Sequence, residues 1–199
     1  MDLCPYETLC SPPPSASPPL SPFCTLFTAP EWTLYNTQKS TDKHNSFGAG
    51  AALGPTQGVG WVNELVARLT GTPVNDHTST NHTLDSDART FPLRRALYAD
   101  FTHDNVMTSI LFALGLYAAE VDMGGFRASE TVPFAGRAVV EKMRCRGEEE
   151  EMVRVVVNGR VMPLARCGGD ALGRCRLGKF VASLEFARRG GRWAECYGS

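Results

Sequence analysis

The chain has 199 residues, of which 43% are hydrophobic and 21% are charged, a composition typical of globular proteins. Its 20 Lys and Arg residues against 21 Asp and Glu residues give a formal net charge of −1, so no basic excess exists to drive binding to nucleic acid. No apolar run is long enough to span a bilayer, and we therefore expect neither nucleic-acid nor membrane partners.

The beginning of the chain is rich in proline. Ser11–Pro19 is predicted to be extended or disordered, because proline fixes φ and removes a hydrogen-bond donor. The first residues lack the basic and apolar regions of a secretory signal peptide. Thr28 and Glu31 have the spacing of a capping box, which predicts a short helix through Trp32 and Tyr35.

A glycine-rich stretch at residues 44–60 precedes a second predicted helix. Apolar residues recur at helical spacing from Val62 to Leu69, and Gly71 follows them as a helix stop. Residues 75–92 are polar and rich in turn formers, so we expect a surface loop there.

The clearest local pattern is a strand, a turn and a helix in succession. Ala96–Phe101 is predicted to be a strand, Thr102–Asn105 a sharp turn, and Met107–Leu114 the apolar face of a helix. Such a turn places His103 and Asp104 between the carboxyl end of a strand and the amino end of a helix.

The last third of the chain mixes strands with one more helix. Ala138–Met143 is predicted to be a strand, and Met152–Val157 and Val161–Leu164 flank Asn158-Gly159, the strongest short hairpin signal. Lys179–Arg188 is predicted to be the last helix. With no internal repeat visible, this mixture indicates an α/β or α+β fold.

His103 and Asp104 are the first candidate for chemistry. Exposed N–H groups and the helix dipole favour an anion such as phosphate at a helix amino end. The imidazole can donate a hydrogen bond to a phosphoryl oxygen, and the carboxylic acid can protonate a leaving alkoxide. From spacing alone the alternative stays open that Asp104 is an ordinary helix N-cap and His103 a turn residue.

The glycine-rich stretch is a weaker candidate. It lacks the Gly-Lys-Ser/Thr of a P-loop and has no preceding strand for a dinucleotide fingerprint, so a tight turn with close helix packing is the favoured interpretation. The seven cysteines include no Cys-x-x-Cys pair, which argues against zinc and favours disulfides in an oxidising compartment. The triplet Asn81-His82-Thr83 is an N-glycosylation acceptor and also indicates secretion.

Leu97–Asn105 followed by Ser109–Tyr117 closely resembles the C-terminal signature of the fungal phytases, which are histidine acid phosphatases. Further segments resemble the same family in the same order, so that the resemblance covers nearly the whole chain: Leu20–Cys24, Gly48–Gly50, Leu53–Gly58, Asn63–Leu65, Asp76–Ser86, Thr90–Leu93, Val132–Phe134, Val153–Val155, Asp170–Cys175 and Trp193–Cys196.

The resemblance implies an α/β fold, namely part of the histidine-phosphatase (phosphoglycerate-mutase-like) fold, with a mixed sheet, flanking helices and part of a helical insert domain. It divides the chain into a proline-rich, disulfide-closed lead-in at residues 1–30, part of the insert domain with the glycine-rich and sequon loops at 31–92, and the C-terminal part of the phosphatase domain at 93–199.

The activity implied by the resemblance is metal-independent and cofactor-free hydrolysis of phosphate monoesters, phytate or similar, through a phosphohistidine. His103 corresponds to the phosphate-binding histidine and Asp104 to the proton donor. Asn105 and Lys43 correspond to substrate-binding positions, although the acidic Asp42 beside Lys43 departs from the family's basic pattern.

The family's nucleophile lies in Arg-His-Gly-x-Arg-x-Pro, and none of the four histidines of this chain lies in such a motif. We therefore interpret the chain as the C-terminal portion of a secreted enzyme, inactive alone. The alternatives are a non-catalytic phosphate-binding protein, a truncated gene product, and a general acid phosphatase without phytate preference.

The resemblance also sorts the cysteines. It pairs Cys167 with Cys175 and Cys4 with Cys24, and it leaves Cys10 as an extra thiol. The family partners of Cys145 and Cys196 lie in the N-terminal part that this chain lacks, so these two residues are expected to pair with that part.

Overall fold

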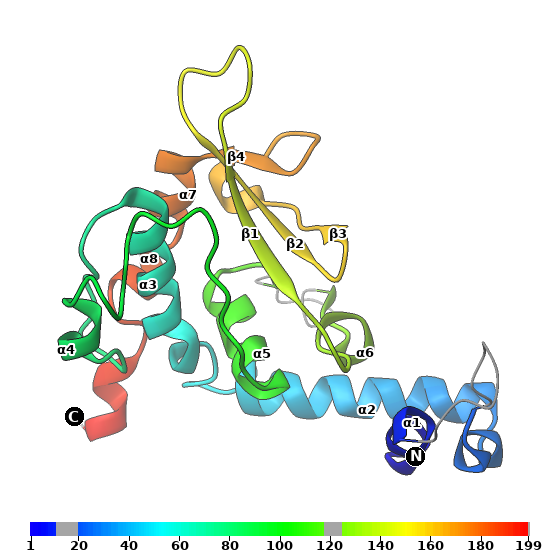
Figure 1. The fold of residues 1–199 in the computed structure, drawn as a ribbon. Coiled ribbons are helices and arrows are strands. Elements are labelled where there is room, and N and C mark those ends of the chain that lie inside the picture. The colour runs from blue at the N-terminus through cyan, green and yellow to red at the C-terminus, as the bar shows by residue number, and fades with distance from the viewer. Residues whose placement is uncertain (11–19, 118–124, 199) are drawn as a thin grey trace.

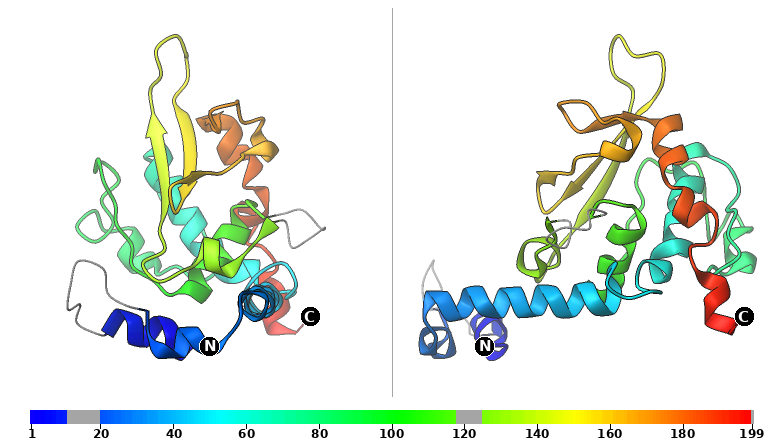
Figure 2. Two further views of the ribbon diagram at one scale, coloured as in Figure 1. Left: turned by 90° about the vertical axis from the view of Figure 1, so that its right-hand side faces the viewer. Right: turned by 180° about the vertical axis from the view of Figure 1, so that it is seen from behind.

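The computed structural model describes residues 1–10, 20–117 and 125–198 (Figure 1). A small antiparallel sheet stands above a group of helices, and one long helix extends away from this body toward the N-terminal region (Figures 1 and 2). The predicted proline-rich segment Ser11–Pro19 lies outside the described residues.

The N-terminal region contains more helix than the sequence patterns predicted. α1 spans Leu3–Cys10, the 3-10 helix η1 spans Pro22–Leu26, and α2 spans Ala29–Phe47. The capping box is present, because the Glu31 carboxylate accepts hydrogen bonds from both the backbone N–H and the hydroxyl of Thr28. The predicted short helix through Tyr35 was wrong in length: the chain meets no glycine or proline until Gly48, so nothing ends the helix sooner.

The second predicted helix is confirmed as α3, Val59–Thr70, and it ends at Gly71, which has φ of +70°. The 3-10 helix η2, Pro55–Gly58, leads into it. The region predicted as a loop at residues 75–92 contains one turn of helix, α4, His82–Asp85.

The predicted helix after the His-Asp turn is confirmed as α5, Asp104–Ala113, and Leu111 in it is fully buried. The predicted strand Ala96–Phe101 is wrong: this segment has no strand partner among the described residues. The residues have the composition of a strand, but a strand exists only where a neighbour satisfies its backbone groups.

Within the described parts of the chain the sheet contains four strands, and every pairing between them is antiparallel. β1, Ala138–Met143, pairs with β2, Met152–Val157, in a register that places Ala138 opposite Val157. On its other side β2 pairs with β3, Arg160–Val161, and with β4, Arg174–Arg176.

The predicted hairpin is confirmed at Asn158-Gly159, where both residues have positive φ, of 49° and 83°. The predicted strand Val161–Leu164 is shorter than expected, because pairing ends at Val161 and the 3-10 helix η4 follows at Ala165–Cys167.

The predicted C-terminal helix Lys179–Arg188 is divided in two. α7 spans Leu177–Ser183 and α8 spans Glu185–Arg188, and Leu184 between them leaves helical geometry at ψ of 27°. Leu184 lies in the core together with Phe180 and Ala187. The 3-10 helix η5, Trp193–Tyr197, follows, and α6, Ala128–Thr131, precedes the sheet.

The core lies between the sheet and the helices α3 and α5. Val153 and Val155 of the central strand β2 meet Val59 and Val62 of α3 and Leu111 of α5 in one buried cluster. Burying these apolar side chains is the main favourable term holding the sheet on the helices. Among the described residues no helix has the length and apolar character needed to cross a membrane.

Candidate functional site

The His-Asp pair lies at the amino end of α5. His103 is the N-cap residue, with extended backbone at φ of −101° and ψ of 161°, and Asp104 is the first helical residue. The alternative that Asp104 itself is the N-cap is therefore wrong. The N–H of Asn105 donates a 2.8 Å hydrogen bond to Oδ1 of Asp104. The positive end of the helix dipole favours an anion at this place.

Lys43 of α2 connects the two helices at this point. Its Nζ lies 2.5 Å from Oδ2 of Asp104 and donates a 2.8 Å hydrogen bond to Oδ1 of Asn105. The side chain of Lys43 is mostly buried and that of Asp104 is half exposed, at 20% and 50% of their full exposure. Three of the residues singled out from the sequence, Lys43, Asp104 and Asn105, are thus in direct contact, and His103 adjoins them.

The ionisation of Asp104 follows from this arrangement. Partial burial alone would raise the pKa of the Asp104 carboxyl. The hydrogen bond and charge of Lys43, the N–H of Asn105 and the nearby His103 outweigh that effect, so the pKa lies below its ordinary value. In the absence of substrate Asp104 is therefore a carboxylate held by a lysine.

A broad open groove of about 1370 Å³ adjoins the pair. His103, Asp104 and Lys43 line it together with Lys39 of α2 and Arg137, which precedes β1. The contribution of Lys39 and Arg137 was missed from the sequence, because their place in the lining of the groove depends on how α2 and the segment before β1 pack rather than on a local pattern. Aromatic side chains such as Trp61 and Phe134 form much of the remaining wall.

The glycine-rich stretch serves packing, as the sequence interpretation favoured. A Cβ at Gly58 would lie 2.6 Å from the backbone N and Cα of Ile110, so η2 and α5 touch backbone to backbone there. This close contact fixes the distance between α5, which begins at Asp104, and the start of α3.

The two disulfides are the ones that the family resemblance implied. Cys4 is bonded to Cys24 and Cys167 to Cys175, whereas Cys10, Cys145 and Cys196 are free thiols. Asn81 is exposed, and its side-chain oxygen accepts hydrogen bonds from the N–H groups of Thr83 and Leu84 at the start of α4. Among the described residues no group of three or more His, Cys, Asp or Glu side chains is placed to hold a metal ion.

An α/β body with an acid, an imidazole and a lysine at a helix amino end defines a candidate phosphoryl-binding protein. Residues 1–158 match the model of the histidine phosphatase superfamily (branch 2). The chain belongs to this superfamily.

Curated relatives support the assignment over the whole chain. It is 52% identical to "Phytase A" of Aspergillus terreus, with 99% of this chain and 44% of that protein aligned. It is 53% identical to "Phytase A" of Aspergillus awamori, over 98% of this chain and 44% of the relative. The chain therefore spans less than half the length of these relatives.

A solved structure supports the fold. The crystal structure of the phytase from D. castellii matches 88% of this chain and 36% of that chain with a TM-score of 0.67, at 22% sequence identity. The arrangement of helices and sheet described above is thus a part of the histidine-phosphatase fold.

Proposed function

We propose that the chain provides the phosphate-binding and proton-donating part of a phytase-like histidine acid phosphatase that hydrolyses phosphate monoesters, phytate or similar. The observation that supports this proposal most strongly is the meeting of His103, Asp104, Asn105 and Lys43 at the amino end of α5 beside an open groove. The relatives' name, Phytase A, agrees with this reaction.

In the proposed reaction a histidine from another stretch of polypeptide attacks phosphorus, and the bond from phosphorus to the leaving oxygen breaks. His103 and the amino end of α5 bind the phosphoryl oxygens, and Asp104 gives its proton to the leaving alkoxide. A water molecule then releases phosphate from the phosphohistidine.

Asp104 must hold a proton to act as the acid, whereas Lys43 favours its ionised form. A bound phosphate ester brings negative charge close to Asp104 and competes for Lys43. Both effects raise the pKa of a neighbouring carboxyl. Binding of substrate therefore favours protonation of Asp104, and Lys43 exchanges its ion pair with Asp104 for one with the phosphate ester.

The nucleophile is proposed to come from a polypeptide corresponding to the part of the relatives that this chain does not match. The open groove beside His103 and the free thiols of Cys145 and Cys196 support a docking of that part here. We also propose the three-part division at residues 30 and 92 and a secreted location, for which the two disulfides and the exposed Asn81 acceptor are the support.

Binding of inorganic phosphate and of phytate to the chain tests the proposal. In NMR titrations both ligands are expected to shift the His103 ring and the Asn105 amide, and to raise the pKa of Asp104. Lys43→Met should weaken binding, whereas Lys179→Met, which removes an equal charge from the exposed surface of α7, should not. Shifts confined to residues away from α5, or equal losses in both variants, would contradict the proposal.

A non-catalytic phosphate-binding protein is the second candidate, and the lack of an Arg-His-Gly motif among the four histidines favours it. It predicts the same binding but no turnover under any condition. A general acid phosphatase is the remaining alternative, and it differs from the proposed enzyme in having no preference for phytate. Equal rates of hydrolysis of phytate and of a small monoester, measured once an active assembly is available, would identify it.

A further inference from the structure

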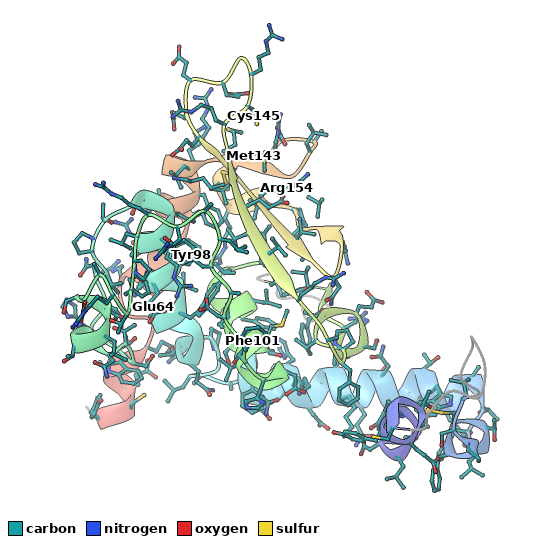
Figure 3. The ribbon with its side chains drawn as sticks, viewed as in Figure 1. Glu64, Tyr98, Phe101, Met143, Cys145 and Arg154 are labelled. Carbon is teal, nitrogen blue, oxygen red and sulfur yellow. A yellow bond between two sulfur atoms is a disulfide. The ribbon has the colours of Figure 1, made fainter. Side chains whose placement is uncertain are left out.

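Arg68 of α3 fixes the segment that leads into the His-Asp turn. Its guanidinium lies 4.9 Å from the ring centre of Phe91 and 5.0 Å from that of Tyr98, so it contacts two aromatic rings. Nη1 of Arg68 also lies 2.5 Å from Oδ2 of Asp100, and the indole N–H of Trp61 donates to the same oxygen at 3.0 Å. Residues 98 and 100 are therefore attached to α3, and Figure 3 labels Tyr98 next to this helix, to which Glu64 belongs.

Side chains alternate along this segment. Tyr98 and Asp100 are held on α3, whereas Leu97 and Phe101 point away from it and are 82% and 97% exposed. Since the segment has no strand partner among the described residues, the contacts with α3 are what fix its path. His103 lies three residues after Asp100 in the sequence, so the path of this segment leads directly into the turn.

Glu64 competes for the same arginine. Glu64 lies one helical turn before Arg68 in α3. Its carboxylate oxygen is 3.6 Å from Nη2 of Arg68, a longer distance than the 2.5 Å between Arg68 and Asp100. Around Glu64 lie the charges of Arg68 on its own helix, Asp85 of α4, Asp100 of the extended segment and Asp76 of the loop after α3. Asp85 Oδ2 and Arg68 Nε are buried without a hydrogen-bond partner among the described residues.

Glu64 thus has three acidic neighbours and one basic one. The pKa of its carboxyl is raised to about 7, chiefly by burial and further by the charges of Asp85, Asp100 and Asp76, against the opposing charge of Arg68. A group with a raised pKa in the folded state contributes stability that is fully present below its unfolded value of 4.5 and is lost as pH rises through about 7.

We propose that Glu64 and Arg68 are positioning residues that hold residues 98–100, and through them the His103–Asp104 turn, on α3 in acid and loosen them as the solution becomes neutral. With a proton on Glu64, Arg68 pairs with Asp100 alone. Without it, a second carboxylate competes for Arg68 and repels Asp85 and Asp100. The link to catalysis rests on the proposed function; the anchoring itself does not.

Hydrogen exchange read by mass spectrometry tests the anchor in the 199-residue chain. After correction for the intrinsic pH dependence of exchange, protection of residues 97–105 is expected to fall about tenfold between pH 5.5 and 8, the equivalent of one pKa unit of coupling. Glu64→Gln mimics the protonated side chain, so this variant should keep its acid-level protection at pH 8.

Glu141→Gln is the matched control, because Glu141 pairs with Arg154 on the sheet and should leave the pH profile unchanged. The proposal is overturned if the wild-type profile is flat, if Glu64→Gln follows the wild type, or if only residues 97–100 respond while 102–105 do not. Because no turnover or ligand is involved, a failure of the anchor is separate from a failure of phosphate to bind at His103.

Discussion

At the scale of single residues, Lys43 sets the charge state of the proposed acid. Its Nζ is 2.5 Å from the Asp104 carboxylate, and the Lys43 side chain is mostly buried. A lysine so placed stabilises the ionised form, which is unusual for a proton donor in its resting state. Under the proposed function, Asp104 would take up its proton when an anion binds rather than before.

Replacing Lys43 isolates this effect. In Lys43→Met the pKa of Asp104 is expected to rise, because the favourable charge and hydrogen bond are lost while partial burial remains. A carbon-detected NMR titration of the carboxyl measures this. Lys179→Met is the control and should leave the pKa of Asp104 unchanged; a lower pKa in Lys43→Met would contradict the account.

A second residue, Gly58, fixes the distance between η2 and α5. Gly58→Ala places a Cβ 2.6 Å from the backbone of Ile110, and we expect a loss of about 1–3 kcal/mol in the free energy of unfolding, as for overpacked cores. Gly178→Ala in α7 is the matched control: its Cβ would meet only Glu150, at 3.6 Å, so stability should be unchanged or slightly higher. Equal denaturation midpoints for both variants would contradict this packing.

At the scale of elements, the hairpin turn also connects the sheet to α6. The Asn158 side chain accepts from the N–H of Arg137 at 2.8 Å and donates to the carbonyls of Glu130 and Thr131 at 2.6 and 3.0 Å. Its backbone has positive φ, which disfavours most side chains.

Two substitutions separate these roles. Asn158→Gly keeps the turn geometry but loses the side-chain bonds, whereas Asn158→Ala loses both, so Asn158→Ala should unfold at the lower denaturant concentration. We expect each to cost about 1–3 kcal/mol in the free energy of unfolding. If the two variants were as stable as the wild type, the turn would not hold α6 to the sheet.

The elements also show what could be predicted from the sequence. The hairpin, α3 and α5 were predictable because each carries its own local signal: an Asn-Gly pair between β-branched runs for the hairpin, and apolar residues at helical spacing for the two helices. The strand at Ala96–Phe101 was not, because strand pairing depends on a second segment. Lys43 was located through family resemblance; its distance to Asp104 follows from the unexpected length of α2.

At the scale of the whole molecule, the side that carries the groove exposes apolar residues: Phe101 and Phe134 line the groove and are both exposed. Phe101 and Leu97 are almost fully exposed, and Phe134 and Val139 are more than one third exposed, beside the groove and along the edge strand β1. Exposed apolar side chains next to an unpaired edge are typical of an interface. This side is where we expect the nucleophile-bearing polypeptide to dock.

Thiol labelling of the folded chain followed by peptide mapping checks the cysteine arrangement. Cys10, Cys145 and Cys196 are expected to react, and the four bonded cysteines are expected to be protected until reduction. Protection of Cys145 and Cys196 in a monomer, or a reactive Cys167, would contradict both the disulfide pattern and the proposed pairing with another part.

The central claim is that this chain binds the phosphoryl group and supplies the proton, while the attacking histidine belongs to another stretch of polypeptide. Release of phosphate from phytate tests it most directly, measured for the chain alone and after oxidative co-refolding with the part of the Aspergillus terreus relative that it does not match. The account predicts no release by the chain alone and release by the mixture that Asp104→Asn removes. Release by the chain alone that Asp104→Asn abolishes would contradict it.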